Sequence, residues 1–172
     1  WQEFGTGLLE AHPERMFEAL ERCGLRAKLL PELREVPKSL SGSLAVRFAV
    51  LCWPLQQSEI EALCDRLRVP NEERDLALLA CRLRASLNAS RPGDLLNLLK
   101  RGDAIRRPGR FAAMLQVARI AQPGFDATKI ERALAAAAAV DAGAVARRAP
   151  APAAIPALID QAREQAIAAA LS

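Results

Sequence analysis

Five cations lie within the eleven residues from 100 to 110 of this sequence: Lys100, Arg101, Arg106, Arg107 and Arg110. Such a cluster can neutralise nucleic-acid phosphates without reading base sequence, and the nearby Gly102 and Gly109 let the backbone approach closely. The same residues also fit a solvated turn whose charges complement a helix C-terminus, with Asp103 offsetting only part of the charge. Contact with an RNA backbone and a merely solvated turn therefore both stay open.

The sequence offers no arrangement of residues for catalysis. His12, the single histidine, precedes an expected helix start and has no carboxylate or cysteine cluster beside it, so we expect a loop or capping role. Phosphoryl transfer needs carboxylates placed for magnesium together with a cradle for the phosphates. Glu72, Glu73 and Asp75 are spaced instead for the first turn of a helix, where the helix dipole favours negative charge. We predict no catalytic residue and no metal site.

The cysteines also argue against a metal or redox site. They stand at scattered spacings with no CxxC motif, at Cys23, Cys52, Cys64 and Cys81. Each falls on an expected apolar helix face, which indicates reduced core residues of a cytoplasmic protein. We expect all four thiols to react slowly in the native state.

Composition favours helices and permits an anionic partner. Of 172 residues, 51% are hydrophobic but only 4% aromatic, because leucine and alanine supply most of the apolar mass. The net charge of +4 permits RNA as a partner without requiring it. The longest apolar stretches are alanine runs shorter than the roughly 20 residues of a membrane span, so we expect no membrane segment. A start at Trp1 without methionine indicates a fragment.

Apolar residues at three- and four-residue spacing between proline and glycine stops define the expected helices. Ser58 and Glu61 form a capping-box pattern at the start of one of them. Loops are expected at 37–43 and in the Pro/Ala-rich stretch around 149–156. The expected helices run from Pro13 to Cys23, Leu25 to Leu30, Leu44 to Trp53, Ser58 to Leu67, Asn71 to Leu87, Pro92 to Lys100, Pro108 to Ala121, Asp126 to Ala139 and Pro156 to Leu171.

No segment alternates apolar and polar residues with a period of two. The sequence therefore predicts an all-α protein, an irregular array of about eight to ten short helices. We expect the arginines of residues 66–84 to pair mainly with local acids, and Trp53 to plug the core. Arg147 and Arg148 fall in an expected linker and offer a further RNA contact.

Three stretches resemble the C-terminal region of bacterial CCA-adding tRNA nucleotidyltransferases, members of the poly(A) polymerase and CCA enzyme family. They are PERMFEALERCGLRAKLLPEL at 13–33, VRFAVLC at 46–52 continued by LCDRLRVPNEERDLALL at 63–79, and the tail at 136–171 with VDAGAVARR and IPALIDQAREQAIAAAL. The string RLRVPNE is the most specific of these signals. Between them, LLNLLKRGDAIRRPGRFAAML resembles the family's helix followed by an Asp-Ala and basic turn, so the likeness covers nearly the whole chain.

The resemblance implies an enzyme that adds or repairs the terminal CCA of tRNA. It places CTP, ATP and magnesium on an N-terminal head with a Gly-Ser turn followed by an Asp-x-Asp pair, a combination that this chain lacks. No cofactor is therefore expected to bind here. The helical C-terminal part of such enzymes grips the acceptor arm and elbow of tRNA, which makes tRNA the expected partner and residues 100–110 the expected contact.

One departure from the family concerns a second activity. In many members the VRFA-x-LC stretch runs into a His-Asp pair that binds metal with other histidines and hydrolyses phosphate esters. Here Trp53 and Pro54 stand in that place, and His12 alone cannot assemble such a site. We expect a helical body region at 1–90 with this degenerate phosphohydrolase-like segment, and a helical tail region at 91–172.

Two functions from different classes remain open. In the first, the chain is the noncatalytic, tRNA-binding C-terminal portion of a CCA-adding nucleotidyltransferase. In the second, it is a helical interaction or dimerisation module, such as a homodimer, without RNA binding. Salt-sensitive tRNA binding favours the first, and concentration-dependent association without RNA binding favours the second.

Overall fold

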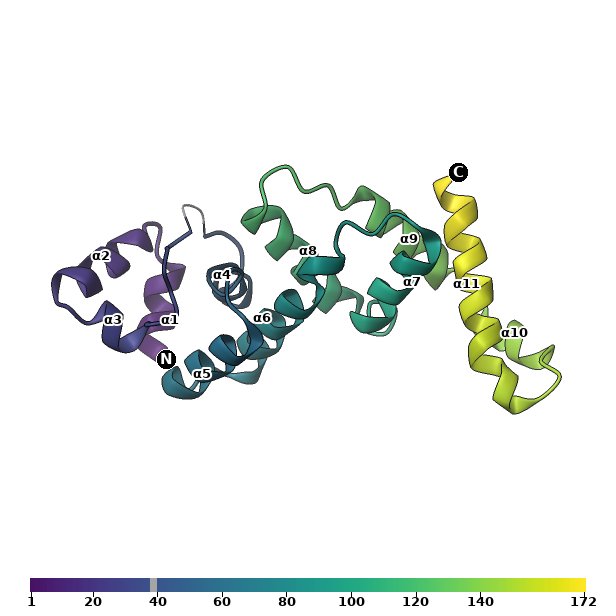
Figure 1. Cartoon of the computed structure of the whole chain (residues 1–172), viewed down its shortest axis with the longest axis horizontal. Helices are drawn as coiled ribbons and strands as arrows, with labels where there is room; N and C mark the ends of the chain where they lie inside the picture. Colours follow the sequence, from purple (N-terminus) through teal and green to yellow (C-terminus); the bar gives the residue numbers. More distant parts are fainter. Residues whose placement is uncertain (38–39) are drawn as a thin grey trace. The chain divides into compact units, whose positions relative to one another are not determined.

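A computed structural model describes residues 1–37 and 40–172, and these residues form helices joined by turns (Figure 1). Within them there are eleven α-helices, nine with seven or more residues, and no strand, which confirms the all-α prediction. Contacts divide the chain into two compact units, residues 1–84 with 112–125 and residues 85–111 with 126–172. In the described part of the chain, no helix combines the length and apolar character needed to cross a bilayer. The assignment of 1–90 and 91–172 to body and tail stays a prediction.

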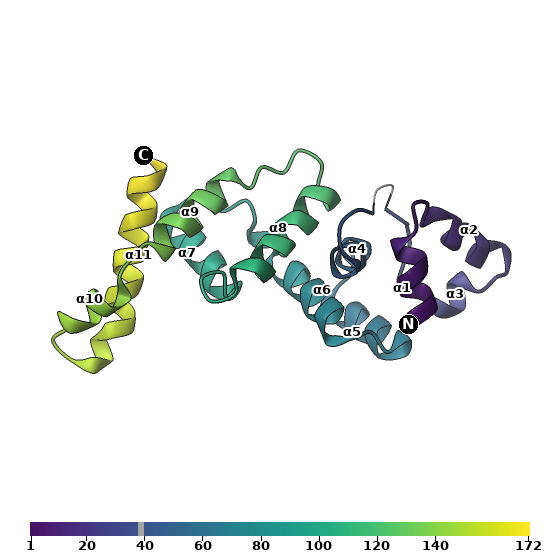
Figure 2. The same ribbon diagram turned by 180° about the vertical axis from the view of Figure 1, so that it is seen from behind.

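The first unit is built around one buried helix. Its helices are α1 (Gln2–Leu9), α2 (Glu14–Arg22), α3 (Arg26–Leu29), α4 (Leu44–Leu51), α5 (Gln57–Leu67), α6 (Asn71–Leu83) and residues 112–121 of α8 (Pro108–Ala121). Helix α4 packs against α6 and α1, and the views from front and back show these helices side by side (Figures 1 and 2). Two residues of the loop expected at 37–43, residues 38 and 39, lie outside the described part.

The sequence of α4 explains its central place. The hydroxyl of Ser43 accepts a hydrogen bond from the backbone N–H of Val46, which satisfies one of the open donors of the first turn. All residues from Ala45 to Leu51 except Arg47 are buried. A helix that is apolar on nearly every side must be enclosed by its neighbours, because each buried Phe, Val or Leu contributes about 1.5–3 kcal/mol.

Helix α5 begins two residues earlier than the Ser58–Glu61 pattern predicted, because its N-cap is Gln56 and not Ser58. The backbone N–H of Gln56 donates to Glu59 Oε2 at 2.7 Å, so the capping box is Gln56–Glu59 and the predicted one is wrong. The RLRVPNE string forms the end of α5 and the start of α6. Arg68 adopts a left-handed conformation with φ of 53°, and the Val69 N–H returns to the Cys64 carbonyl.

The second unit gathers three helices around buried leucine, isoleucine and alanine side chains. Its elements are α7 (Pro92–Arg101), α9 (Thr128–Ala138), α10 (Ala142–Arg147), a 3₁₀ turn (Pro152–Ala154), α11 (Ile155–Leu171) and residues 108–111 of α8. Helix α11 packs against α9 and α7, with Ile167 fully buried. Leu158, Ile159 and Ala162 on the same helix are partly exposed. Arg147 ends the short helix α10 rather than lying in a linker.

The cysteines divide into buried and accessible thiols, which corrects one expectation. All four are free; Cys52 and Cys64 are buried, Cys81 is partly exposed and Cys23 is exposed. The prediction that all four lie in the core is wrong for Cys23, because it caps the C-terminus of α2 where the buried face has ended. Burial raises the pKa of Cys64 to about 11, and burial raises that of Cys52 well above its ordinary value.

We therefore expect a thiol reagent at pH 8 to label Cys23 rapidly and to leave Cys52 and Cys64 unlabelled until the protein unfolds. A thiol with a pKa of about 11 holds roughly a hundredfold less thiolate than an ordinary one, and burial adds a steric barrier. Peptide mass spectrometry after timed labelling identifies the modified thiol. Labelling of Cys64 as fast as Cys23 would show that the packing of α5 is wrong.

Candidate nucleic-acid interface

The end of α7 fixes the backbone of the cation cluster. Gly102 has an ordinary helical conformation, and Asp103 is the residue with a left-handed φ of 52°. The Asp103 N–H donates to the Lys100 carbonyl at 3.0 Å, and the Ala104 N–H donates to the Leu99 carbonyl at 2.9 Å. These two bonds form a Schellman motif that closes the helix, and Ala104 is fully buried beneath the turn.

The sequence predicted that Gly102 and Gly109 let the backbone of this turn approach a partner closely. The structure places the left-handed residue at Asp103, a position where aspartate is one of the few residues that tolerate positive φ. At Gly109 an added Cβ would meet no atom within 4 Å, so this glycine leaves the surface open. The backbone is thus accessible at Gly109, whereas Gly102 is buried.

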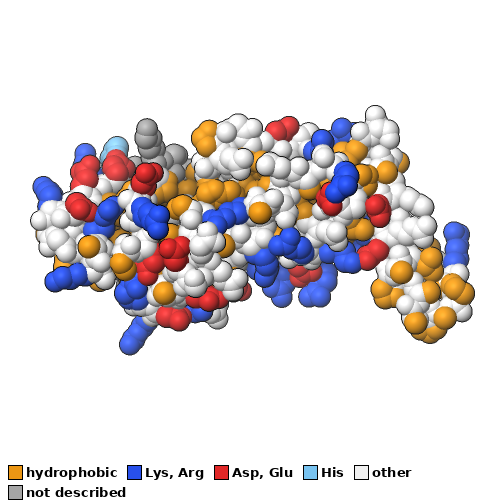
Figure 3. Space-filling model, viewed as in Figure 1, with side chains coloured by type: hydrophobic (Ala, Val, Ile, Leu, Met, Phe, Trp, Pro, Cys, Tyr) orange, Lys and Arg blue, Asp and Glu red, His pale blue; other side chains and the backbone are white. Residues whose placement is uncertain are grey.

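All five predicted cations lie in the second unit, and we call them the basic turn: Lys100, Arg101, Arg106, Arg107 and Arg110. Figure 3 shows Lys and Arg side chains gathered over the α7–α8 turn. Four of the five residues are exposed, and Arg110 is partly exposed. The structure therefore places the predicted residues in one region of one unit; whether they bind RNA is a separate question.

Three of these cations pair with two carboxylates. Arg106 Nε lies 3.5 Å from Asp103 Oδ1, and Arg107 Nε lies 3.5 Å from Asp103 Oδ2. The side chains of Arg106 and Arg107 are 77% and 55% exposed, so these pairs are open to water and contribute little to stability. Lys100 Nζ pairs with Asp160 of α11, and Arg101 donates to the Ser86 hydroxyl at 3.0 Å.

Three arginines of residues 66–84 have structural roles. Arg66 donates to the Leu29 carbonyl at 3.0 Å and pairs with Glu32, and Arg74 pairs with Asp65 at 2.8 Å. The predicted pairing with local acids is thus confirmed for Arg74, whereas the acid bound by Arg66 is distant in sequence. These contacts tie α5 to α3 and α5 to α6, so both side chains are engaged within the first unit.

Arg84 binds backbone oxygens rather than an acid. One of its terminal nitrogens donates to the carbonyls of Trp53 and Leu55, the latter at 2.9 Å. This holds the turn after α4, where Trp53 is partly exposed instead of plugging the core. Among the described residues, no group of three or more His, Cys, Asp or Glu side chains is arranged to hold a metal ion.

A hollow of about 370 Å³ lies beside this turn. Three glutamates and one arginine contribute its charges, and its lining consists of Glu32, Arg34, Glu35, Pro54, Leu55, Gln56 and Glu59. This excess of negative charge opposes binding of a phosphate group. The hollow is therefore a poor candidate for an RNA contact, which leaves the basic turn as the better one.

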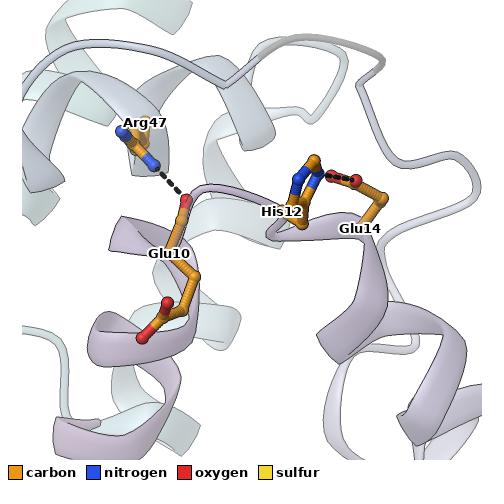
Figure 4. Close-up of polar contacts among 4 residues, drawn as sticks. All are labelled: Glu10, His12, Glu14 and Arg47. Atoms are coloured by element: carbon orange, nitrogen blue, oxygen red, sulfur yellow. Dashed lines mark hydrogen bonds and ion pairs between the residues drawn. The ribbon is translucent and has the colours of Figure 1, made fainter.

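His12 has a partner that the sequence analysis did not foresee. Its Nδ1 lies 2.9 Å from Glu14 Oε1, and both side chains are exposed (Figure 4). Hydrogen bonds from its own backbone N–H and from His12 lower the pKa of Glu14. The pair sits at the start of α2, close to the place where Arg47 binds the Glu10 carbonyl. This arrangement fits a local contact between two exposed side chains rather than a reaction centre.

Comparison with known proteins gives a consistent set of relatives. The multifunctional CCA protein of Cupriavidus necator is 36% identical to this chain over 163 residues, which covers 67% of this chain and 40% of the relative. The multifunctional CCA protein of Burkholderia pseudomallei is 36% identical over 165 residues, covering 69% of this chain and 40% of the relative. This chain thus spans about two fifths of the length of these curated relatives. No family model and no solved structure matches it.

The alignment is longer than the part of this chain that it includes. With the Cupriavidus necator protein it runs over 163 positions, whereas 67% of 172 residues is about 115. The difference, about 48 positions, corresponds to residues of the relative that have no counterpart here.

Proposed function

Since this chain is homologous to the multifunctional CCA proteins and fits a C-terminal portion of such an enzyme, we propose that it is the noncatalytic, tRNA-binding portion. The observation that carries the proposal is the basic turn, with Arg106 and Arg107 extending into solvent from one short segment. The proposed ligand is the sugar-phosphate backbone of tRNA at its acceptor arm and elbow. The proposed place of action is the cytoplasm.

The chemistry of the basic turn suits a backbone ligand. Arginine presents a planar fork of N–H donors that matches two phosphate oxygens, and its charge does not depend on pH in the physiological range. Exposed cations recognise phosphates without regard to base sequence, which suits a protein that must accept every tRNA. Tight, buried ion pairs would not release their cations in this way.

Our proposal assigns nucleotide addition to a head that resembles those of the family, and not to this chain. CTP, ATP and magnesium would be bound by that head, whose combination of a Gly-Ser turn with a following Asp-x-Asp pair is absent from the sequence. The segment at Trp53 and Pro54 would serve as scaffold in place of a phosphohydrolase centre. The contribution of this chain is then to hold the tRNA while its 3′ end reacts elsewhere.

The test is a titration of fluorescently labelled tRNA with the chain, followed by anisotropy at several salt concentrations. We expect log affinity to fall linearly with log salt, with a slope of about −2 to −4.5 for three to five phosphate contacts at 0.7–0.9 each. A parallel titration with an unrelated tRNA is expected to give the same affinity within about threefold, since backbone contacts carry little base information. Absence of binding at low salt would refute the proposed function.

One structural feature supports the alternative function, a helical interaction or dimerisation module. An apolar hollow of about 340 Å³ lies in the first unit, lined by Trp1, Glu3, Phe4, Met16, Leu20, Leu29, Leu30 and Leu67. Leu29 is 39% exposed at this place, an unusual position for a large apolar side chain. Sedimentation analysis over a wide concentration range distinguishes the two functions. Self-association without tRNA binding would favour the interaction module.

A further inference from the structure

We propose that Asp103 and Asp160 compete with RNA phosphates for the cations of the basic turn and so limit how tightly this surface holds RNA. The inference rests on the proposed RNA-binding function and concerns the control of affinity at the same place. It assigns a role to two carboxylates that neither stabilise a buried pair nor complete any arrangement of catalytic residues. Their position relative to Lys100, Arg106 and Arg107 is what carries the argument.

Asp103 lies between two arginines without holding either firmly. Each of its carboxylate oxygens is 3.5 Å from one arginine Nε, whereas a charge-assisted hydrogen bond measures about 2.7–2.9 Å. Arg106 and Arg107 are therefore drawn toward Asp103 by charge but remain largely in water. A phosphate with two well-placed oxygens can form the shorter bonds that Asp103 does not form.

The backbone keeps Asp103 in place when a phosphate approaches. Its left-handed conformation and its N–H bond to the Lys100 carbonyl belong to the motif that closes α7. The side chain is 35% exposed, so its charge is only partly screened. A like charge held about 6 Å from a bound phosphate weakens binding roughly threefold in water, and more strongly where water is displaced.

Asp160 has the same effect on Lys100 from a distant part of the sequence. It projects from α11, sixty residues further along the chain, and pairs with the Lys100 ammonium at the end of α7. The lysine side chain is 49% exposed, so it is accessible to RNA while still paired. Lys100 must share or leave this carboxylate in order to bind a phosphate. Removing Asp160 would thus free a cation that is already in position.

The test replaces each carboxylate with its uncharged amide and measures tRNA affinity. Asp103→Asn keeps the side-chain shape and tolerates a positive φ, so the turn should persist. We expect Asp103→Asn and Asp160→Asn each to bind tRNA about threefold to tenfold more tightly at 50 mM salt. The gain should shrink to less than about twofold at 0.5 M salt, since screening removes the repulsion.

Asp94→Asn is the matched control. Asp94 pairs with Arg91 at 2.8 Å, so it is also half of an exposed Arg–Asp pair three residues apart. It lies in the first turn of α7, about 9 Å along the helix axis from Lys100. We expect its affinity for tRNA to match that of the parent chain within about twofold, because Asp94 pairs with Arg91 outside the basic turn and its exposed charge is screened by water and salt.

Two failures can be told apart. If the parent chain binds tRNA but Asp103→Asn and Asp160→Asn behave like Asp94→Asn, the competition is refuted and the proposed function stands. A gain in affinity that is independent of salt would also refute it, because a structural effect rather than charge would then be responsible. If the parent chain binds no tRNA at low salt, the proposed function and this inference fall together.

Discussion

Replacing Arg106 and Arg107 together with alanine is expected to weaken tRNA binding by about tenfold to fiftyfold at 0.1 M salt. Of the three cations of the basic turn that pair with Asp103 or Asp160, these two have the more exposed side chains. Each can reach a different phosphate. The loss should be equal for all tRNAs, since no base contact is involved. The slope of log affinity against log salt should fall by about 1.4–1.8, or 0.7–0.9 for each lost phosphate contact.

A second double variant separates local contact from overall charge. Arg15→Ala with Arg22→Ala removes the same charge from exposed positions on α2, in the first unit. It should change tRNA affinity by less than about threefold, because an exposed charge that makes no contact with the RNA is screened. The free energy of unfolding of both double variants should differ from that of the parent chain by no more than about 0.5 kcal/mol per substitution. An unchanged salt slope after the loss of Arg106 and Arg107 would exclude the basic turn as the binding surface.

Helices whose ends are marked by proline or glycine could be predicted from the sequence almost to the residue. Pro108 at the first position of α8 and the left-handed Gly24 after α2 are backbone signals that depend only on neighbouring residues. The helix expected at Leu44–Trp53 begins at the predicted residue and ends at Leu51. In each case the determining interaction lies within a few residues along the chain.

Helix α1 shows why the remainder could not be predicted. Its sequence contains Gly5 and Gly7, which disfavour an isolated helix, and no expected helix included them. In the structure these glycines allow close packing: a Cβ at Gly5 would lie 3.2 Å from Leu44 Cδ2, and one at Gly7 would collide with Met16. The helix is thus stabilised by neighbours that are distant in sequence.

The same distinction applies to the candidate site. The five cations could be found from their density in the sequence, but nothing near Lys100 indicated that its partner would be Asp160. The charge of Asp103 was visible in the sequence, but its left-handed backbone was not. The second carboxylate beside the basic turn, Asp160, therefore became apparent only from the fold.

Arg47 illustrates a second role that only the fold reveals. It is the one residue between Ala45 and Leu51 of α4 that is not buried. Its Nη1 donates to the carbonyls of Leu8 at 2.7 Å and Glu10 at 3.0 Å, and its Nε donates to the Gly42 carbonyl at 3.1 Å. One guanidinium thus satisfies oxygens at the C-terminus of α1 and in the loop before α4, where the helix dipole also favours a cation (Figure 4).

Replacing Arg47 with methionine is expected to lower the free energy of unfolding of the first unit by about 2–4 kcal/mol, since hydrogen bonds to charged donors contribute about 1.5–3 kcal/mol each and are not additive. Both tryptophans, Trp1 and Trp53, lie in this unit, so tryptophan fluorescence during urea unfolding reports on it alone. Arg47→Lys keeps the charge but not the planar fork, and it should lose an intermediate amount. Arg22→Met, at an exposed position, is the control and should change stability by less than about 0.5 kcal/mol. If Arg47→Met and Arg22→Met unfold at the same urea concentration, the three carbonyl contacts contribute nothing net, and α1 must be held to α4 by apolar packing alone.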